Sequence, residues 1–315
     1  MLPFSTITLS PAIDILISTD KFPEPGDVLK GFGEIETPGG KGLNSARWLA
    51  MRGHPVLAAG LLGLERAELF EQMLSDYRIH DALIRVKGPS RRNVMFSTPG
   101  GMFKLNRSAF PDLCAEDWSV ARVIDPCIAH APVCVIAGSL PFSVDPTVYA
   151  DMIVRLRAAG VSAVLDTSGL ALEAGLEAGP CVIKPNRYEC AELLGNEPHT
   201  PDDFKAACLR LLEKCACVII SDGPDGCWFA DRNGGGHVFH GTAPLVDVVD
   251  TTAAGDALLA EFCHHYFPAL VLDETAIRFA CAAGAAATTM PGADAPSLDL
   301  VDRLAKEVRI TMSCP

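Results

Sequence analysis

Two segments rich in small residues could bind an anion through their backbone amides. The first reads Pro-Gly-Gly-Lys-Gly-Leu-Asn over residues 38–44, and the second reads Asp-Thr-Thr-Ala-Ala-Gly-Asp over residues 250–256. Apolar residues at helical spacing follow each segment. Small residues at the start of a helix leave several N–H groups unpaired and pointing in one direction, which favours a negative ligand. Such a turn could neutralise the charge on a phosphoryl group during its transfer.

Each segment also has a simpler interpretation. Asp256 would stand beside the amides of the second segment, but it could be only a first-turn acid that the helix dipole stabilises by about 0.3–1 kcal/mol. The first segment could be a tight turn that carries a solvated Lys41. Neither segment decides the function by itself.

Two further motifs follow predicted strands. Lys-Pro-Asn-Arg-Tyr-Glu over residues 184–189 offers Asn186 as a helix N-cap, and Ser-Asp-Gly-Pro-Asp-Gly over residues 221–226 reads as a turn after a buried strand. Both motifs are common in proteins. The pattern GxxxxGK[ST] is absent from the chain, which disfavours P-loop chemistry. A GxGxxG fingerprint after the first strand is missing too, which weakens the hypothesis of a nicotinamide-dependent dehydrogenase.

The elements that must position these motifs alternate between strands and helices. Short apolar runs predict strands at 4–9, 56–61, 133–137, 162–166, 181–184 and 218–221. Helical periodicity predicts helices at 42–53, 116–129, 145–160, 186–194, 202–214 and 275–289. This alternation is typical of a mostly parallel sheet covered by helices on both faces, which is a three-layer α/β/α fold.

Two regions interrupt the alternation. Residues 12–36 and 91–107 read as short strands without helices between them, and the second region contains the hairpin signal Pro99-Gly100-Gly101. We expect them to form a small antiparallel β flap, or lid, beside the main sheet. No linker separates independent units, so we expect one domain over residues 1–315.

Composition excludes several classes of function. The chain has 315 residues, with 26 Lys and Arg against 39 Asp and Glu, so its formal net charge is −13. This acidic balance argues against nucleic-acid or anionic-membrane partners. Twelve cysteines without a CxxC pair suggest thiols in a reducing compartment. With no basic residue in 1–13 and no apolar run long enough to span a bilayer, we expect a soluble, cytoplasmic protein.

Taken in order and spacing, the four motifs resemble the ribokinase-like carbohydrate kinases, the phosphofructokinase-B family, over nearly the whole chain. The chain is most similar to the branch that phosphorylates phosphosugars. Further features of this resemblance are Thr8-Leu9-Ser10-Pro11-Ala12-Ile13-Asp14, Arg92-Asn93-Val94, Gly138-Ser139-Leu140-Pro141 and Asp166-Thr167-Ser168-Gly169. The resemblance implies a ribokinase-like fold with a β lid, and it implies ATP and Mg²⁺ as cofactors.

The resemblance also implies catalytic roles. Asp256 matches the family's catalytic base, and the amides of Ala253, Ala254, Gly255 and Asp256 match its anion hole. An aspartate with an ordinary pKa of about 3.9 is a weak base for a sugar hydroxyl, so we expect it to orient the hydroxyl and accept the proton late. Ala253 stands where glycine is usual, and we expect it to have an ordinary φ and to leave the hole intact.

The remaining site residues fall into two groups. For the sugar, the resemblance implies contacts with Asp14, Gly39, Gly40, Lys41, Asn44, Arg92, Asn93 and Ser139. The phosphate of the sugar needs cations. We expect Arg92 and Lys41 to supply them, ahead of Lys30 and Arg107, whereas Lys104 reads as lid surface.

For the nucleotide, the resemblance implies contacts with Lys184, Asn186, Ser221, Gly223, Gly226, Ala283 and Gly284, and it implies that Glu189 places Mg²⁺ through water. The Ala-rich helix at 275–289 is explained equally well by close core packing. Asp222 stands where the family usually has leucine, and we have no interpretation of that change.

The predicted function is ATP-dependent phosphorylation of fructose 1-phosphate to fructose 1,6-bisphosphate. Phosphorylation of tagatose 6-phosphate or fructose 6-phosphate is the nearest alternative. A catalytically silent sugar-phosphate sensor is a second hypothesis, supported by Ala253 and Asp222. A kinase for an unphosphorylated sugar or nucleoside is a third, and it predicts no cationic pocket. The exposed edges of the lid strands suggest a homodimer.

Overall fold

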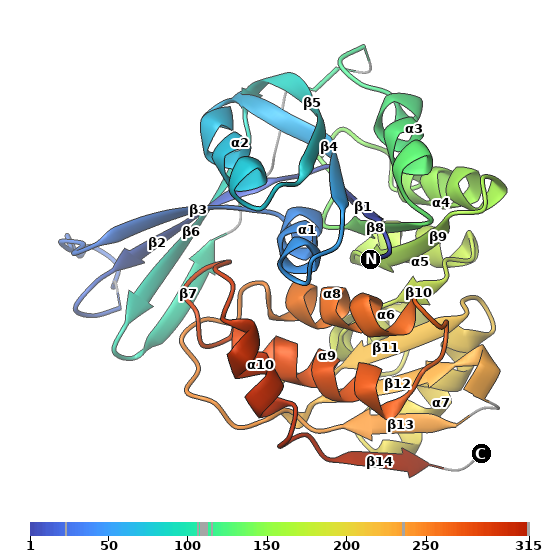
Figure 1. Cartoon of the computed structure of the whole chain (residues 1–315). Helices are drawn as coiled ribbons and strands as arrows, with labels where there is room; N and C mark the ends of the chain where they lie inside the picture. Colours follow the sequence, from blue (N-terminus) through green and yellow to red (C-terminus); the bar gives the residue numbers. More distant parts are fainter. Residues whose placement is uncertain (23, 106, 108–112, 115, 235–236, 314–315) are drawn as a thin grey trace.

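A computed structural model of the chain describes residues 1–22, 24–105, 107, 113–114, 116–234 and 237–313 (Figure 1). In these residues a ten-stranded sheet runs through the molecule and a four-stranded sheet projects beside it. Residues 23 and 106, which fall within the predicted lid segments, lie outside the described residues.

The large sheet has the strand order β14-β13-β12-β11-β10-β9-β8-β1-β4-β5. Strands from β11 to β5 in this order pair in parallel, whereas β12, β13 and β14 extend the sheet by antiparallel pairing. The bounds are Phe4–Thr8 (β1), Val56–Glu65 (β4), His80–Pro89 (β5), Val133–Ala137 (β8), Ser162–Asp166 (β9), Val182–Ile183 (β10), Cys217–Ser221 (β11), Cys227–Asp231 (β12), Val238–Gly241 (β13) and Ile310–Ser313 (β14).

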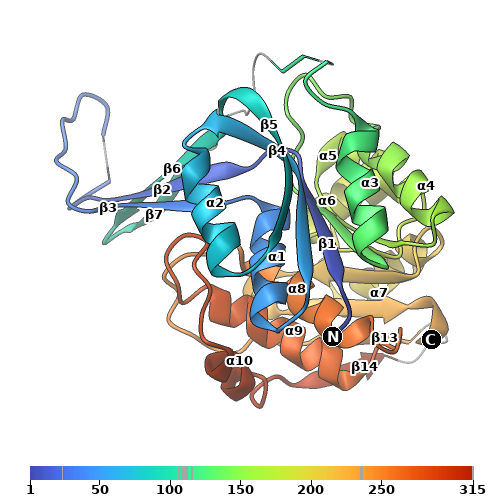
Figure 2. The same ribbon diagram turned by 45° about the horizontal axis from the view of Figure 1, so that its top comes forward.

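Helices cover both faces of this sheet (Figures 1 and 2). One core holds side chains of Lys41–Met51 (α1), Ala67–Asp76 (α2), Ala254–Tyr266 (α8), Glu274–Ala287 (α9) and Leu298–Leu304 (α10). The other core holds side chains of Val120–His130 (α3), Val148–Ala158 (α4), Gly169–Glu177 (α5), Arg187–Leu194 (α6) and Pro201–Leu212 (α7). Because side chains alternate along a strand, β1 sends Phe4 into the first core and Ile7 into the second. The predicted three-layer α/β/α arrangement is confirmed.

The small sheet is the predicted lid. Its strand order is β3-β2-β6-β7, with bounds Ala12–Ser18 (β2), Glu34–Gly39 (β3), Arg91–Thr98 (β6) and Gly101–Leu105 (β7). The outer pairs are antiparallel, and the β6–β7 hairpin turns at the predicted Pro-Gly-Gly segment. The central strands β2 and β6 run parallel, a pairing that the sequence did not predict. The lid stands off the end of the large sheet (Figure 2).

Capping residues explain where several helices begin. Asn186 and Glu189 form a reciprocal capping box at the start of α6, as Thr200 and Asp203 do at the start of α7. Helix α3 begins at Val120 rather than at 116, because Ser119 accepts the N–H of Arg122 and fixes the N-cap there.

Cys114 apart, the described cysteines are free thiols, as the sequence predicted, and most of them are buried. In the described part of the chain, no helix is long and apolar enough to cross a membrane.

Candidate active site

The two small-residue segments meet at one end of the strands of the large sheet. Helix α1 begins after Gly40 and helix α8 begins after Ala253, so both segments end in the first turn of a helix. The Nδ2 of Asn44 donates a hydrogen bond to Oδ2 of Asp256 at 2.8 Å, although 212 residues separate the two side chains in the sequence. The helices lie side by side (Figures 1 and 2). Asp256 therefore shares a site with the glycine-lysine-glycine segment.

Two lysines surround a buried carboxylate next to this contact. The Nζ of Lys41 lies 3.0 Å from Oδ1 of Asp166, and the Nζ of Lys184 lies 3.4 Å from the same oxygen. A Cβ at Gly255 would lie 3.1 Å from the Lys184 Nζ, so the second segment runs directly over this lysine. Two cations within reach of the turn amides make this region suited to the phosphates of a ligand.

Burial and neighbouring charges together shift the pKa values of two carboxylates at the site in opposite directions. Burial raises the pKa of Asp256 to about 6, and the negative charge of Asp166 adds to the rise, against Lys41, Asn44 and Lys184. Burial would also raise the pKa of Asp166, but Lys184 and Lys41 hold it below its ordinary value. The expectation that Asp256 is a weak base with an ordinary pKa was therefore wrong. A carboxylate with a pKa near 6 is a better proton acceptor at neutral pH.

The expected backbone of Ala253 was also wrong. Ala253 has φ 61° and ψ 0°, which places it in the left-handed region rather than at an ordinary φ. The chain needs this turn to enter α8, and a residue with a Cβ adopts it at a cost of about 1–2 kcal/mol. The amides of Gly255 and Asp256 still occupy the first turn of the helix, where no preceding carbonyl of the helix can accept from them. Ala254 donates a long bond of 3.4 Å to the carbonyl of Thr251.

The lid contributes the opposite wall. Asp14 on β2 and Asn93 on β6 are register partners, and the Asn93 Nδ2 donates to Oδ1 of Asp14 at 2.7 Å. A Cβ at Gly39 would lie 2.8 Å from the other Asp14 oxygen, so a larger residue there would displace this carboxylate. Among the described residues, buried Oδ1 of Asn44, Oδ1 of Asn93 and Oδ2 of Asp166 have no hydrogen-bond partner. Such orphaned polar atoms are typical of a surface that binds a polar ligand.

Arg92, which was predicted to contact the sugar phosphate, does not lie on this wall. Arg92 is exposed and pairs with Glu36 on the lid at 3.0 Å, so its position does not support the predicted phosphate contact. Successive side chains of a strand point to opposite faces, and Arg91 takes the other face of β6. The Nη1 of Arg91 donates a hydrogen bond to Oγ of Ser139 at 3.2 Å, and the positive charge of Arg91 favours the ionised form of Asp14. Arg91 and Ser139 therefore lie together beside the predicted sugar-binding residues.

The predicted nucleotide residues outside helix α9 lie at or shortly after the carboxyl ends of β10 and β11. Asn186 pairs with Ser221 in a parallel bridge, and Glu189 Oε2 accepts the N–H of Asn186 at 2.8 Å. Gly223 begins a 3-10 turn and Gly226 follows it, with φ of 56° and 101°. Asp222, which had no interpretation from sequence, pairs with Arg187 at 3.2 Å.

Helix α9 contradicts part of the predicted adenine contact. Ala283 has no exposed surface and belongs to the core beneath the sheet, so it cannot line an open cleft. Gly284 is buried against α8, where a Cβ would lie 3.4 Å from Leu258. The Ala-rich pattern of this helix therefore reflects close helix packing, which was the alternative interpretation.

Sequence reasoning missed three side chains at the site. Asp166 is the last residue of the buried parallel strand β9, and carboxyl ends of such strands are where α/β proteins bind ligands. Arg91 could have been found from strand alternation, because it shares a face with Asn93. Lys104 was assigned to the lid surface, but its Nζ donates to Oγ1 of Thr252 at 3.2 Å, within the second segment. That contact crosses from the lid to the main body, and no local pattern predicts it.

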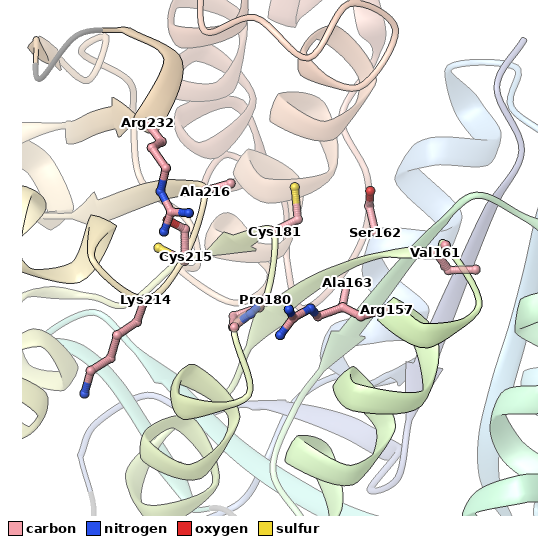
Figure 3. Close-up of a pocket in the computed structure, with 12 residues that line it drawn as sticks. Arg157, Val161, Ser162, Ala163, Pro180, Cys181, Lys214, Cys215, Ala216 and Arg232 are labelled. Atoms are coloured by element: carbon pink, nitrogen blue, oxygen red, sulfur yellow. The ribbon is translucent and has the colours of Figure 1, made fainter.

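A separate pocket of about 360 Å³ lies at the other end of the strands (Figure 3). Ser162 lines it, whereas Asp166 at the far end of the same strand belongs to the site. Figure 3 shows Arg157, Lys214 and Arg232 reaching the pocket from separate elements. Arg157 and Arg232 bond to carbonyls at the ends of α5 and α7, and Lys214 pairs with Glu177. These cations offset the partial negative charge of helix C-termini, so the pocket gains little attraction for an anion.

Comparisons with known proteins agree with this geometry. A 1-phosphofructokinase from Vibrio cholerae is 30% identical over 312 residues, which cover 98% of this chain and 97% of that protein. A 1-phosphofructokinase from Haemophilus influenzae is 33% identical over 315 residues, with coverage of 98% and 97%. The crystal structure of phosphofructokinase-2 from Escherichia coli in complex with substrates and products matches with a TM-score of 0.88 at 26% identity, covering 97% of this chain and 99% of that one.

The fold and the site together define a sugar kinase of the ribokinase-like class. Residues 7–300 match the family model described as pfkB family carbohydrate kinase, so the chain belongs to that family.

Proposed function

We propose that the protein transfers the terminal phosphoryl group of ATP to fructose 1-phosphate and forms fructose 1,6-bisphosphate. The observation that carries the proposal is the 2.8 Å hydrogen bond between Asn44 and Asp256, because it joins the predicted sugar-binding segment to the predicted base. The 1-phosphofructokinases among the relatives support the choice of sugar.

In the proposed reaction, Asp256 accepts the proton of the sugar 6-hydroxyl as its oxygen attacks the terminal phosphorus. The new O–P bond forms as the bond from that phosphorus to the ADP oxygen breaks. The amides of Gly255 and Asp256 and the ammonium groups of Lys41 and Lys184 neutralise the charge that develops. Burial raises the pKa of Asp256, which suits it to this role.

The sugar would be held by side chains on both walls. Asp14, Asn44 and Asn93 offer the carboxylate and amide groups that pair with sugar hydroxyls. Arg91 and Ser139 would bind the phosphate of the substrate in place of Arg92. Each charge-assisted bond of this kind contributes about 1.5–3 kcal/mol. The lid would close over the sugar and keep water from the phosphoryl group, which prevents wasteful hydrolysis of ATP.

The residues present fit a magnesium ion. The buried Oδ2 of Asp166 lacks a hydrogen-bond partner among the described residues. Glu189 lies close enough to Lys41 for its negative charge to favour the protonated lysine. Mg²⁺ prefers carboxylate and water oxygens. Asp166 and Glu189 would hold the hydrated ion, which supplies further neutralisation of the phosphates. No group of three or more acidic, His or Cys side chains that could bind a metal directly occurs in the described residues.

We also propose that the protein is a cytoplasmic homodimer that pairs through its lids. Strand β7 is an edge strand whose residues are all exposed. Phe22 and Phe103 pack edge to face on the lid, with exposed fractions of 49% and 45%. An apolar edge that has no neighbouring strand among the described residues is usually covered by a partner. The free thiols support a reducing compartment.

A coupled assay that follows ADP release, with a panel of sugars, tests the proposed reaction. We expect the highest kcat/KM with fructose 1-phosphate, lower values with tagatose 6-phosphate and fructose 6-phosphate, and little turnover of unphosphorylated fructose. A preference for unphosphorylated sugars would contradict the proposal. Sugar binding without ADP release would instead support the sensor hypothesis, which the left-handed Ala253 favours.

A further inference from the structure

The two helices that begin at the candidate site are joined by a second polar contact farther along their length. The carboxylate of Glu261 on α8 has no exposed surface. It accepts hydrogen bonds from Nε1 of Trp48 at 2.7 Å and from Nε and Nη2 of Arg52 at 2.8 Å and 2.5 Å. We call Trp48, Arg52 and Glu261 the α1–α8 brace.

The brace continues the line of the contact between Asn44 and Asp256. Asn44 and Trp48 on α1 and Arg52 at its C-cap are spaced by four residues, so they lie along one side of the helix. On α8, Glu261 follows Asp256 by five residues. With a rise of 1.5 Å per residue, the brace lies about 6–12 Å along α1 from the Asn44 contact. The contact between Asn44 and Asp256 near the start of the two helices is thus accompanied by a buried ion pair farther along them.

The chemistry of the brace suits it to fixing geometry. Burial would raise the pKa of Glu261, but the adjacent imidazole of His265 and the hydrogen bonds from Arg52 and Trp48 hold it below its ordinary value, so the carboxylate stays charged. A buried ion pair stabilises a fold no better than well-packed apolar side chains do. A bidentate arginine–carboxylate pair does, however, restrict both the sliding and the rotation of one helix against another.

We propose that Glu261 is a positioning residue for phosphoryl transfer. Through Trp48 and Arg52 it sets how α8 lies against α1, and so where Asp256 and its turn amides stand relative to Asn44. A misplacement of about 1 Å in such a site can lower the rate about 10²-fold. The inference rests on the proposed function, because it concerns the same site.

Glu261→Gln tests the inference, because the amide keeps the shape of the side chain but directs N–H groups at the donors of Arg52. We expect kcat to fall at least about tenfold, with both KM values within about threefold of wild type. Cys263→Ala is the matched control, because Cys263 is fully buried on the same helix but lies near Cys217 of the sheet. It should lower the melting temperature and leave kcat unchanged. The wild-type rate, measured beside them, tests the proposed function separately.

An NMR titration of the Asp256 carboxyl carbon needs no turnover. It distinguishes a positioning role of Glu261 from one that only stabilises the fold, because a stabilising role would not change the pKa of Asp256. The hydrogen bond from Asn44 lowers the pKa of Asp256, so a displaced α8 should raise that pKa toward its value in Asn44→Ala. If Glu261→Gln does not fold, Arg52→Lys takes its place, because lysine keeps the charge but loses the bidentate contact. Arg52→Lys should likewise lower kcat and raise the pKa of Asp256. Wild-type kcat and a wild-type Asp256 titration in these variants, with only the melting temperature lowered, would overturn the inference.

Discussion

Ala253 holds a backbone conformation that its own side chain disfavours, at the turn where phosphate would bind. Ala253→Gly removes the clash of the Cβ at φ 61° but adds freedom to the unfolded chain. We therefore expect the free energy of unfolding to rise by up to about 1 kcal/mol and kcat to stay within about threefold of wild type. Thermal melts and steady-state kinetics check this. A kcat that rises tenfold or more would mean that alanine impairs the anion hole.

Several site residues could be predicted from sequence because the motifs that contain them are local. Gly39, Lys41, Asn44 and Asp256 lie within or beside small-residue turns that read as helix starts. The pKa of Asp256 could not be predicted, because it depends on burial and on Asp166, which a different strand supplies.

Strand alternation decides which arginine of the lid faces the proposed sugar site. Arg91 bonds to Ser139 near Asp14, whereas Arg92 pairs with Glu36 on the other face of β6. We expect Arg91→Gln to raise the KM for fructose 1-phosphate at least about tenfold, which matches the loss of one charge-assisted bond. Arg92→Gln is the matched control and should change that KM less than threefold. A larger rise in KM for Arg92→Gln than for Arg91→Gln would indicate that Arg92 binds the sugar phosphate.

The helices and strands that the sequence missed lack local signals. Helix α2 begins after Arg66, which has φ 62° and makes no side-chain cap, so no cap residue marks its start. Strand β5 is an edge strand with a mixed polar pattern. Strand β14 pairs with β13 from far along the chain, and such non-local pairing leaves no pattern in either segment. The strands of the parallel centre, which are buried on both faces, were predicted well for the opposite reason.

For the whole molecule, the lid would link catalysis to assembly in the proposed homodimer. Its inner face carries Asp14 and Asn93, and its exposed apolar side chains include Phe22 and Phe103. If two lids pair in a homodimer, Phe103→Glu should weaken the dimer at least about tenfold, because it would bury a charge. Sedimentation velocity over a dilution series measures this, with Leu64→Glu, an exposed position outside the lid, as the control. A wild-type monomer at micromolar concentration would contradict the proposed dimer.

The most direct test of the account measures kcat/KM for fructose 1-phosphate against pH in wild type and in Asp256→Asn. Burial raises the pKa of Asp256 to about 6 and the base must be ionised, so wild-type kcat/KM should fall as pH drops through about 6. Asp256→Asn should lower kcat by about 10²–10⁴-fold at pH 7.5 and lose this acidic limb, while sugar binding persists. An Asp256→Asn protein that keeps a kcat within threefold of wild type would contradict the role of this carboxylate and the site built around it.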